Sequence, residues 1–153
     1  FSKRIVRSIL TYRESTGPIT RTHELAKIIK QAVPKRETGR DPATRTFQAL
    51  RIKVNEEIEE VEQALPIAFD FLKPKGRLVV ISFHSLEDRI VKTFFRDEQK
   101  GCSCPPKIPM CICGRAQTLK ILTRKPIVPS EEEVARNPRS ISAKLRVAER
   151  VYV

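Results

Sequence analysis

The amino-acid sequence predicts an α/β fold, in which a helical first half precedes strands that alternate with helices. Apolar residues recur every three or four positions through most of the first 72 residues, a spacing typical of helices. The apolar run at 78–81 predicts a buried strand over 77–82. A helical pattern follows this strand after a two-residue loop, and a strand that passes directly into a helix is half of a parallel α/β unit.

Two helices are predicted before residue 34. Residues 3–12 have helical spacing, and Gly17-Pro18 ends that pattern. Thr22 is expected to cap a second helix that ends at Pro34. The buried side of this helix is predicted to be Leu25, Ile28, Ile29 and Val33. The segment 34–40 is expected to be a basic, polar loop.

A long helix is predicted to begin at Asp41-Pro42, with aspartate as N-cap and proline in the first helical position. Its narrow apolar stripe continues to Leu65. Pro66 is expected to break the helix, because proline removes a backbone hydrogen bond. A short helix over 67–72 follows, and Gly76 ends the helical region.

The helix after the first strand is predicted to begin at Ser85, with Asp88 three residues later in the spacing of a capping box. Its apolar stripe would be Leu86, Ile90, Val91 and Phe94. A loop rich in cysteine and proline spans 100–118, and a strand is predicted over 119–123.

The last segment is predicted to be a short helix followed by a strand. Ser130 and Glu133 form a second capping-box pattern for a helix that ends at Arg136. Residues 142–151 alternate as in a half-buried strand. One side of that strand would be Ala143, Leu145 and Val147, and the other Lys144, Arg146 and Ala148.

The net charge of +12 is unevenly spread along the 153 residues. Residues 1–53 hold 13 Lys or Arg against 4 acids, a net charge of +9, whereas residues 54–72 hold 6 acids and no base. A basic surplus at one end favours an anionic partner, most simply RNA phosphates, although basic residues also serve solubility. The 7 Phe and 2 Tyr, with no Trp, argue against recognition by rows of stacked bases.

A stripe of polar residues runs along the long helix beside the apolar one. Because its members recur at four, three and four positions, they are expected to be half-buried. They are Thr44, Gln48, Arg51 and Asn55. Such side chains can read base edges and phosphates, or form a structural hydrogen-bond network, which is the slightly favoured interpretation. For contacts with an RNA backbone the stronger candidates are Arg40, Arg45 and Arg139.

Polar residues also follow the first strand, at the end where α/β sheets bind ligands. Ser82 could contact a base or a cofactor, whereas His84 could line a pocket or simply hold the loop together by hydrogen bonds. The two interpretations of His84 are weighted equally. Ser85 and Asp88 are interpreted as helix caps first.

Four cysteines follow the pattern C-x-C-x6-C-x-C, namely Cys102, Cys104, Cys111 and Cys113. Four thiolates suit tetrahedral zinc, although C-x2-C is the usual spacing. Disulfides are not expected, because the chain has no recognisable secretory signal and is interpreted as cytoplasmic. No apolar run approaches the length of a membrane span.

Three long motifs in this chain resemble one protein family. They are GRLVVISFHSLEDRIVKTFFR (76–96), DPATRTFQALRIKVNEE (41–57) and NPRSISAKLRVAER (137–150). The chain is similar to the bacterial small-subunit ribosomal RNA cytosine-N4 methyltransferases of the RsmH/MraW type, which use S-adenosylmethionine. The resemblance implies the C-terminal strands of a Rossmann-like methyltransferase sheet over 41–153, with a helical, RNA-facing insertion over 1–40.

The resemblance also implies what this chain lacks. The family's methyl-donor site lies upstream, in a first strand with a glycine-rich loop and in a later acidic loop. The five glycines of this chain stand far apart, so no cofactor-binding residue is assigned. In the family's pocket, Ser82 and His84 would lie near the target cytosine, whose weakly nucleophilic amine must be oriented and must lose a proton.

The leading hypothesis is therefore that this chain is part of a ribosomal RNA methyltransferase and is inactive alone. The strand at 77–82 would leave an apolar edge open, so an upstream fragment or a second copy is expected to cover it. The alternative is a non-catalytic, basic RNA-binding module that zinc could stabilise.

Overall fold

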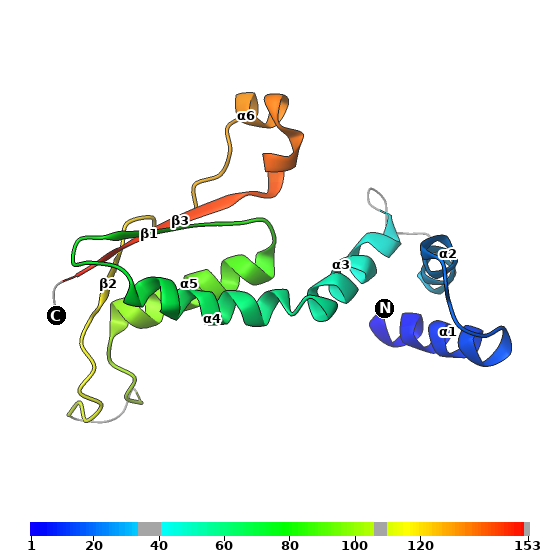
Figure 1. Cartoon of the computed structure of the whole chain (residues 1–153), viewed down its shortest axis with the longest axis horizontal. Coiled ribbons are helices and arrows are strands. Elements are labelled where there is room, and N and C mark those ends of the chain that lie inside the picture. Colours follow the sequence, from blue (N-terminus) through cyan, green and yellow to red (C-terminus); the bar gives the residue numbers. More distant parts are fainter. Residues whose placement is uncertain (34–40, 106–109, 152–153) are drawn as a thin grey trace. The chain divides into compact units, whose positions relative to one another are not determined.

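The structure is a computed structural model that describes residues 1–33, 41–105 and 110–151. Figure 1 shows its elements, which belong to two compact units, Phe1–Glu57 and Ile58–Val153. The described residues contain no helix long and apolar enough to cross a membrane. The first unit is helical, and the second combines helices with a sheet, so the mixed α/β class is confirmed.

Three helices form the first unit: α1 (Ser2–Ser15), α2 (Thr22–Ala32) and α3 (Pro42–Val54). Its core is Ile29, Val33 and Ala43, against which Leu25 and Phe47 pack. The α2 start differs from the prediction, because Arg21 rather than Thr22 is the N-cap residue. The carboxylate of Glu24 accepts hydrogen bonds from the amides of Thr20 and Arg21, both at 3.1 Å.

The predicted helix break at Pro66 is wrong. The chain breaks instead between α3 and α4 (Glu57–Asp70), where Glu56 has a φ of 52°. Helix α4 continues through Pro66. Packing explains this continuity, because Leu65 is buried and Phe69 makes an edge contact with Phe94, so burial on both sides offsets the lost hydrogen bond.

The sheet contains β1 (Arg77–Ser82), β2 (Leu119–Ile121) and β3 (Lys144–Arg150), in the order β1-β3-β2. Both ladders are antiparallel. Since β1 and β2 each run opposite to β3, they point in the same direction, and α5 (Ser85–Lys100) connects them. The expected parallel pairing is therefore not found among the described strands. A parallel unit would place β1 beside β2, but β3 lies between them.

Helices cover one face of this sheet. Figure 1 shows α4 and α5 together on that side. The core there consists of five buried residues, Leu65, Val91, Phe95, Leu119 and Ala148. On β1, Leu78 and Val80 pack against this core, whereas Val79 and Ile81 remain 52% and 54% exposed. The expectation that β1 is buried throughout is therefore wrong, because only one of its faces is covered.

The last part of the chain matches the predicted order of elements. Helix α6 (Glu131–Arg136) is capped by Ser130, whose Oγ accepts from the Glu133 amide at 3.2 Å. A 3-10 helix that was not predicted, η1 (Pro138–Ser142), leads into β3. On β3 the buried side chains are Arg146 and Ala148. The more apolar side of the predicted alternation, with Leu145 and Val147, is only half-buried.

Candidate functional site

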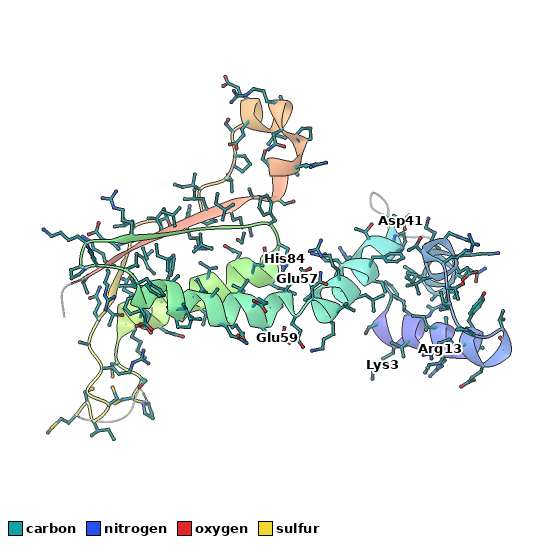
Figure 2. All side chains as sticks on the ribbon, viewed as in Figure 1. Lys3, Arg13, Asp41, Glu57, Glu59 and His84 are labelled. Atoms are coloured by element: carbon teal, nitrogen blue, oxygen red, sulfur yellow. The ribbon has the colours of Figure 1, made fainter. Side chains whose placement is uncertain are left out.

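His84 joins the end of β1 to the start of α5 (Figure 2). Its Nδ1 accepts a hydrogen bond from the Glu87 amide at 3.4 Å. The Glu87 carboxylate in turn accepts from the amides of Phe83 at 2.8 Å and His84 at 3.2 Å. The capping box is therefore His84–Glu87, one residue earlier than predicted, and Ser85 is the first helical residue rather than the cap.

The hydrogen bond at Nδ1 assigns the ring nitrogens of His84 different roles. Because Nδ1 accepts, the proton is on Nε2. Nε2 is shielded from solvent and makes no hydrogen bond among the described residues, although Glu87 Oε1 lies 3.2 Å away in a poorly aligned position. The contacts in this structure are those of a loop-tying residue. A target base could reach Nε2 only after the ring or Glu87 moved.

Ser82 lies two residues before His84, at the last position of β1. It is 4% exposed, and its Oγ donates to the Lys144 carbonyl at 3.4 Å. Both strand-end candidates are thus held in place by local hydrogen bonds. Their place in a target-base pocket stays a prediction.

Asp88 does not cap the helix but forms a buried ion pair with β3. Arg146 donates from Nε to Oδ1 at 2.7 Å and from Nη2 to Oδ2 at 3.2 Å. Lys144 Nζ lies 3.5 Å from Oδ2. The Arg146 hydrogen bonds lower the pKa of Asp88 despite the opposing effect of burial, and the charges of Arg146 and Lys144 act in the same direction. The pair fixes the first turn of α5 on the strand beside Ser82.

Sequence reasoning missed this ion pair, although a signal was present. Arg146 and Ala148 are two residues apart on β3 and therefore lie on the same face of the strand, and Ala148 packs against the core. A buried arginine requires an acid, and Asp88 stands on the first turn of the neighbouring helix.

In the first unit, an open cavity of about 770 Å³ lies against α2 and α3. Its lining includes three members of the predicted polar stripe, Thr44, Gln48 and Arg51. The stripe is more exposed than expected, since only Gln48 is half-buried. Asp41, at the same cavity, pairs with Lys30 at 2.7 Å, and this hydrogen bond, together with one from the Ala43 amide, lowers the pKa of Asp41.

Two stripe residues are engaged by one acid. Arg51 donates to both oxygens of Glu57, at 2.7 and 3.0 Å, and Asn55 Nδ2 donates to Oε1 at 3.1 Å. These contacts are consistent with a structural network for Arg51 and Asn55, and the RNA-binding role of the stripe stays a prediction. Among the arginines expected to contact RNA, Arg45 and Arg139 are exposed, and Arg40 lies outside the described residues.

The four cysteines come together in the loop between α5 and β2. Their sulfurs all lie within 4.8 Å of one another, and all four thiols are free. Hydrogen bonds from the Arg115 and Ser103 amides, with a further one from Cys111, lower the pKa of Cys113 to about 5. The Cys104 amide acts to lower the pKa of Cys102, but hydrogen bonds with the other three sulfurs raise it to about 11. The pKa values of Cys102 and Cys113 therefore move in opposite directions within one cluster.

Comparison with known proteins covers nearly the whole chain. The model of the MraW methylase family matches residues 1–151. Proteins named ribosomal RNA small subunit methyltransferase H are 56% identical in Heliobacterium mobile and 54% identical in Caldicellulosiruptor saccharolyticus, over 99% of this chain and 49% of each relative. The relative from Dehalococcoides mccartyi is 56% identical over 99% of this chain and 42% of its own length. The chain thus spans about half the length of the curated relatives it matches.

Proposed function

This chain belongs to the MraW methylase family, and we propose that it forms part of an S-adenosylmethionine-dependent methyltransferase acting on the N4 amine of a cytosine in small-subunit ribosomal RNA. The observation that carries the proposal is the family match over residues 1–151, which includes both the helical unit and the sheet. The relatives' name supports ribosomal RNA as the substrate. In this proposal the chain supplies RNA contacts and one side of the target-base pocket.

The β1–α5 junction is the proposed pocket side. Ser82 and His84 stand where β1 ends, and the Asp88–Arg146 pair holds the following helix turn on the sheet. A rigid junction suits the orientation of a poor nucleophile, since positioning lowers the barrier before any proton moves. With its proton on Nε2, His84 would donate to an acceptor atom of the base once uncovered, rather than accept the amine proton.

The described residues do not fit S-adenosylmethionine. A donor site of the nucleotide-binding type needs free amides in a glycine-rich turn. At the end of β1 the amides of Phe83 and His84 are already bound by Glu87. Of the glycines, Gly101 ends α5 and Gly76 lies in the turn before β1. We therefore propose that the methyl donor is bound by residues outside this chain.

The proposed RNA contacts lie mainly in the first unit. Figure 2 labels Lys3 and Arg13 on α1, which also carries the exposed Arg4 and Arg7. Residues 1–53 hold a net charge of +9. Distributed surface charge of this kind binds phosphates without reading bases, so it would position the RNA rather than select the cytosine.

The uncovered face of the sheet supports the proposal that a further protein segment packs on it. Val79 pairs with Val147 and Ile81 with Leu145, so four apolar side chains line the face opposite the helices. The outer edge of β1 has no partner strand among the described residues. We propose that a donor-binding segment, or a second copy of the chain, covers this surface.

One experiment distinguishes the proposed methyltransferase from the alternative, a basic RNA-binding module without catalysis. The upstream half of the Heliobacterium mobile relative would be fused to this chain, and methyl transfer from labelled S-adenosylmethionine to small-subunit ribosomal RNA would be measured. The proposal expects N4-methylcytidine in the digested RNA. RNA binding without methylation, in a fusion that binds the donor normally, would favour the alternative.

A further inference from the structure

The cysteine-bearing loop leaves and rejoins the folded body at a narrow base. Helix α5 ends at Gly101, which has a φ of +67°. A Cβ there would lie 2.5 Å from the Ala116 carbonyl, so the two branches of the loop touch where they begin. Figure 1 shows the loop extending away from α5 and β2. Each branch carries one Cys-x-Cys pair, so the pairs face each other across the loop.

The distances between the sulfurs match a tetrahedron. Cys111 Sγ lies 3.6 Å from Cys102, 3.8 Å from Cys104 and 3.5 Å from Cys113. Cys113 and Cys102 are 3.8 Å apart. Four sulfurs bound to one zinc ion at about 2.3 Å stand about 3.8 Å from each other. These four distances are close to the spacing in such a site, and the remaining sulfur pairs lie within 4.8 Å.

Backbone amides from opposite branches donate to these sulfurs. The Ser103 amide donates to Cys113 Sγ at 3.4 Å, and the Ile112 amide donates to Cys104 Sγ at 3.4 Å. Such donors orient thiolate ligands and spread their negative charge. Each bond joins one Cys-x-Cys pair to the other, so the amides are arranged around the sulfur cluster rather than along either branch.

The described part of this loop has no apolar core of its own. The two core clusters contain no residue between Gly101 and Gln117, and Met110 and Ile112 are 77% and 78% exposed. Only its base is tied to the body, where Arg115 pairs with Glu98 at 2.9 Å and Thr118 bonds to the same carboxylate. A structural metal supplies folding free energy to small segments of this kind.

The charge of the segment also suits a tetrathiolate site. Zinc with four thiolates carries a net charge of about −2. Lys100, Lys107 and Arg115 lie within 100–118, and no acidic residue occurs between Glu98 and Glu131. In sequence, the segment between Glu98 and Glu131 therefore adds no negative charge to that of the loaded site.

We propose that Cys102, Cys104, Cys111 and Cys113 bind one zinc ion as a closed tetrathiolate site. Zinc suits this ligand set, because soft thiolates in tetrahedral geometry select it or iron, and four protein ligands leave no open position for catalysis. The ion is structural. It clamps the two branches and fixes the connection between α5 and β2.

The test is elemental analysis of the purified chain, prepared without chelator and under reducing conditions. We expect about one zinc per chain, and replacement by Co²⁺ should give thiolate-to-cobalt charge-transfer and d–d bands typical of tetrahedral sulfur coordination. Cys111→Ser should lose the metal and the bands. Ile112→Ala keeps the amide and all four thiols, so this control should retain both.

Removal of zinc has a second readout that needs no variant. Chelation should expose the Arg115 bond to trypsin and leave the far-ultraviolet circular dichroism of the body largely unchanged, and added Zn²⁺ should restore protection. Well under one metal per chain, with four freely titrating thiols, would overturn the proposal. Stoichiometric iron, or disulfides within the cluster, would also overturn it. None of these outcomes depends on methyl transfer.

Discussion

Arg146 on β3 holds Asp88 on α5 through two parallel hydrogen bonds, and both side chains are about nine-tenths buried. A bidentate guanidinium–carboxylate pair constrains direction as well as distance. The pair therefore fixes where α5 begins relative to the sheet, and with it the turn that carries His84.

Asp88→Ala should destabilise the chain by about 3 to 5 kcal/mol, because it leaves the buried Arg146 without a counter-charge. Arg77→Ala is the matched control, since Arg77 pairs with Glu149 at 3.2 Å but its side chain is 65% exposed. That exposed pair should cost under about 1 kcal/mol. Urea denaturation of both variants measures the difference. Equal losses would show that the Asp88 pair is not desolvated.

The pH dependence of stability should carry the signature of Asp88. Its pKa in the folded chain is lowered from the ordinary 3.8 by the Arg146 hydrogen bonds. Its contribution is therefore fully present above that value and is lost as pH falls through the lower folded pKa. Asp88→Asn should have a lower free energy of unfolding than the parent at neutral pH. The difference between the two should shrink only as pH falls below about 4. The Lys30 hydrogen bond also lowers the pKa of Asp41. The double variant Asp88→Asn/Asp41→Asn should therefore have the free energy of unfolding that depends least on pH in acid.

Two substitutions at His84 separate a capping role from a chemical one. Asparagine is a good N-cap residue, whereas His84→Ala removes the acceptor for the Glu87 amide and should cost about 0.5 to 2 kcal/mol. In the fusion enzyme, His84→Ala should lower turnover more than it weakens donor binding. If His84→Asn restores stability and turnover together, the residue acts by positioning. Loss of donor binding with an unchanged single-turnover rate would remove His84 from the target side.

RNA affinity should fall steeply with salt, and α1 should carry much of the slope. Each phosphate contact contributes about 0.7 to 0.9 to the slope of log affinity against log salt. Lys3, Arg4 and Arg7 are exposed on α1, and replacing all three by alanine should flatten the slope. The control makes the same charge change in the second unit, at Lys120, Arg124 and Lys125. A parent chain whose affinity ignores salt would contradict this prediction.

The chain alone should not bind S-adenosylmethionine. The amides at the end of β1 are occupied by Glu87, and the five glycines stand far apart in the sequence. Calorimetry with the purified chain should give no saturable heat. Micromolar binding that S-adenosylhomocysteine displaces would mean that these residues build a donor site by another route.

Local patterns predicted the elements of this fold well, and long-range pairing poorly. Ser130 and Asp41 cap their helices as predicted, since capping depends on residues one to three positions apart. The continuity through Pro66 was missed because it depends on what α4 packs against, and no local pattern indicated the break at Glu56. The order β1-β3-β2 was missed because no local pattern specifies which strand lies between two others.

The candidate sites follow the same division. The cysteine cluster could be predicted, because its ligands are close in sequence. The Asp88–Arg146 pair could not be read as easily, since its members are 58 residues apart and each had a satisfactory local interpretation. The polar stripe of α3 was seen, but Glu57, which binds both Arg51 and Asn55, was not recognised as their partner.

The central position of β3 sets the order in which this chain can fold during synthesis. Both ladders of the sheet use β3, and β3 follows β1 by more than 60 residues. Until residues 144–150 leave the ribosome, β1 and β2 have no shared neighbour, and the apolar surface of α5 has no complete sheet to cover. The helical first unit can form early from local contacts, but the sheet must wait for its last strand. The apolar side of α5 is therefore the surface of the second unit that stays uncovered longest during synthesis.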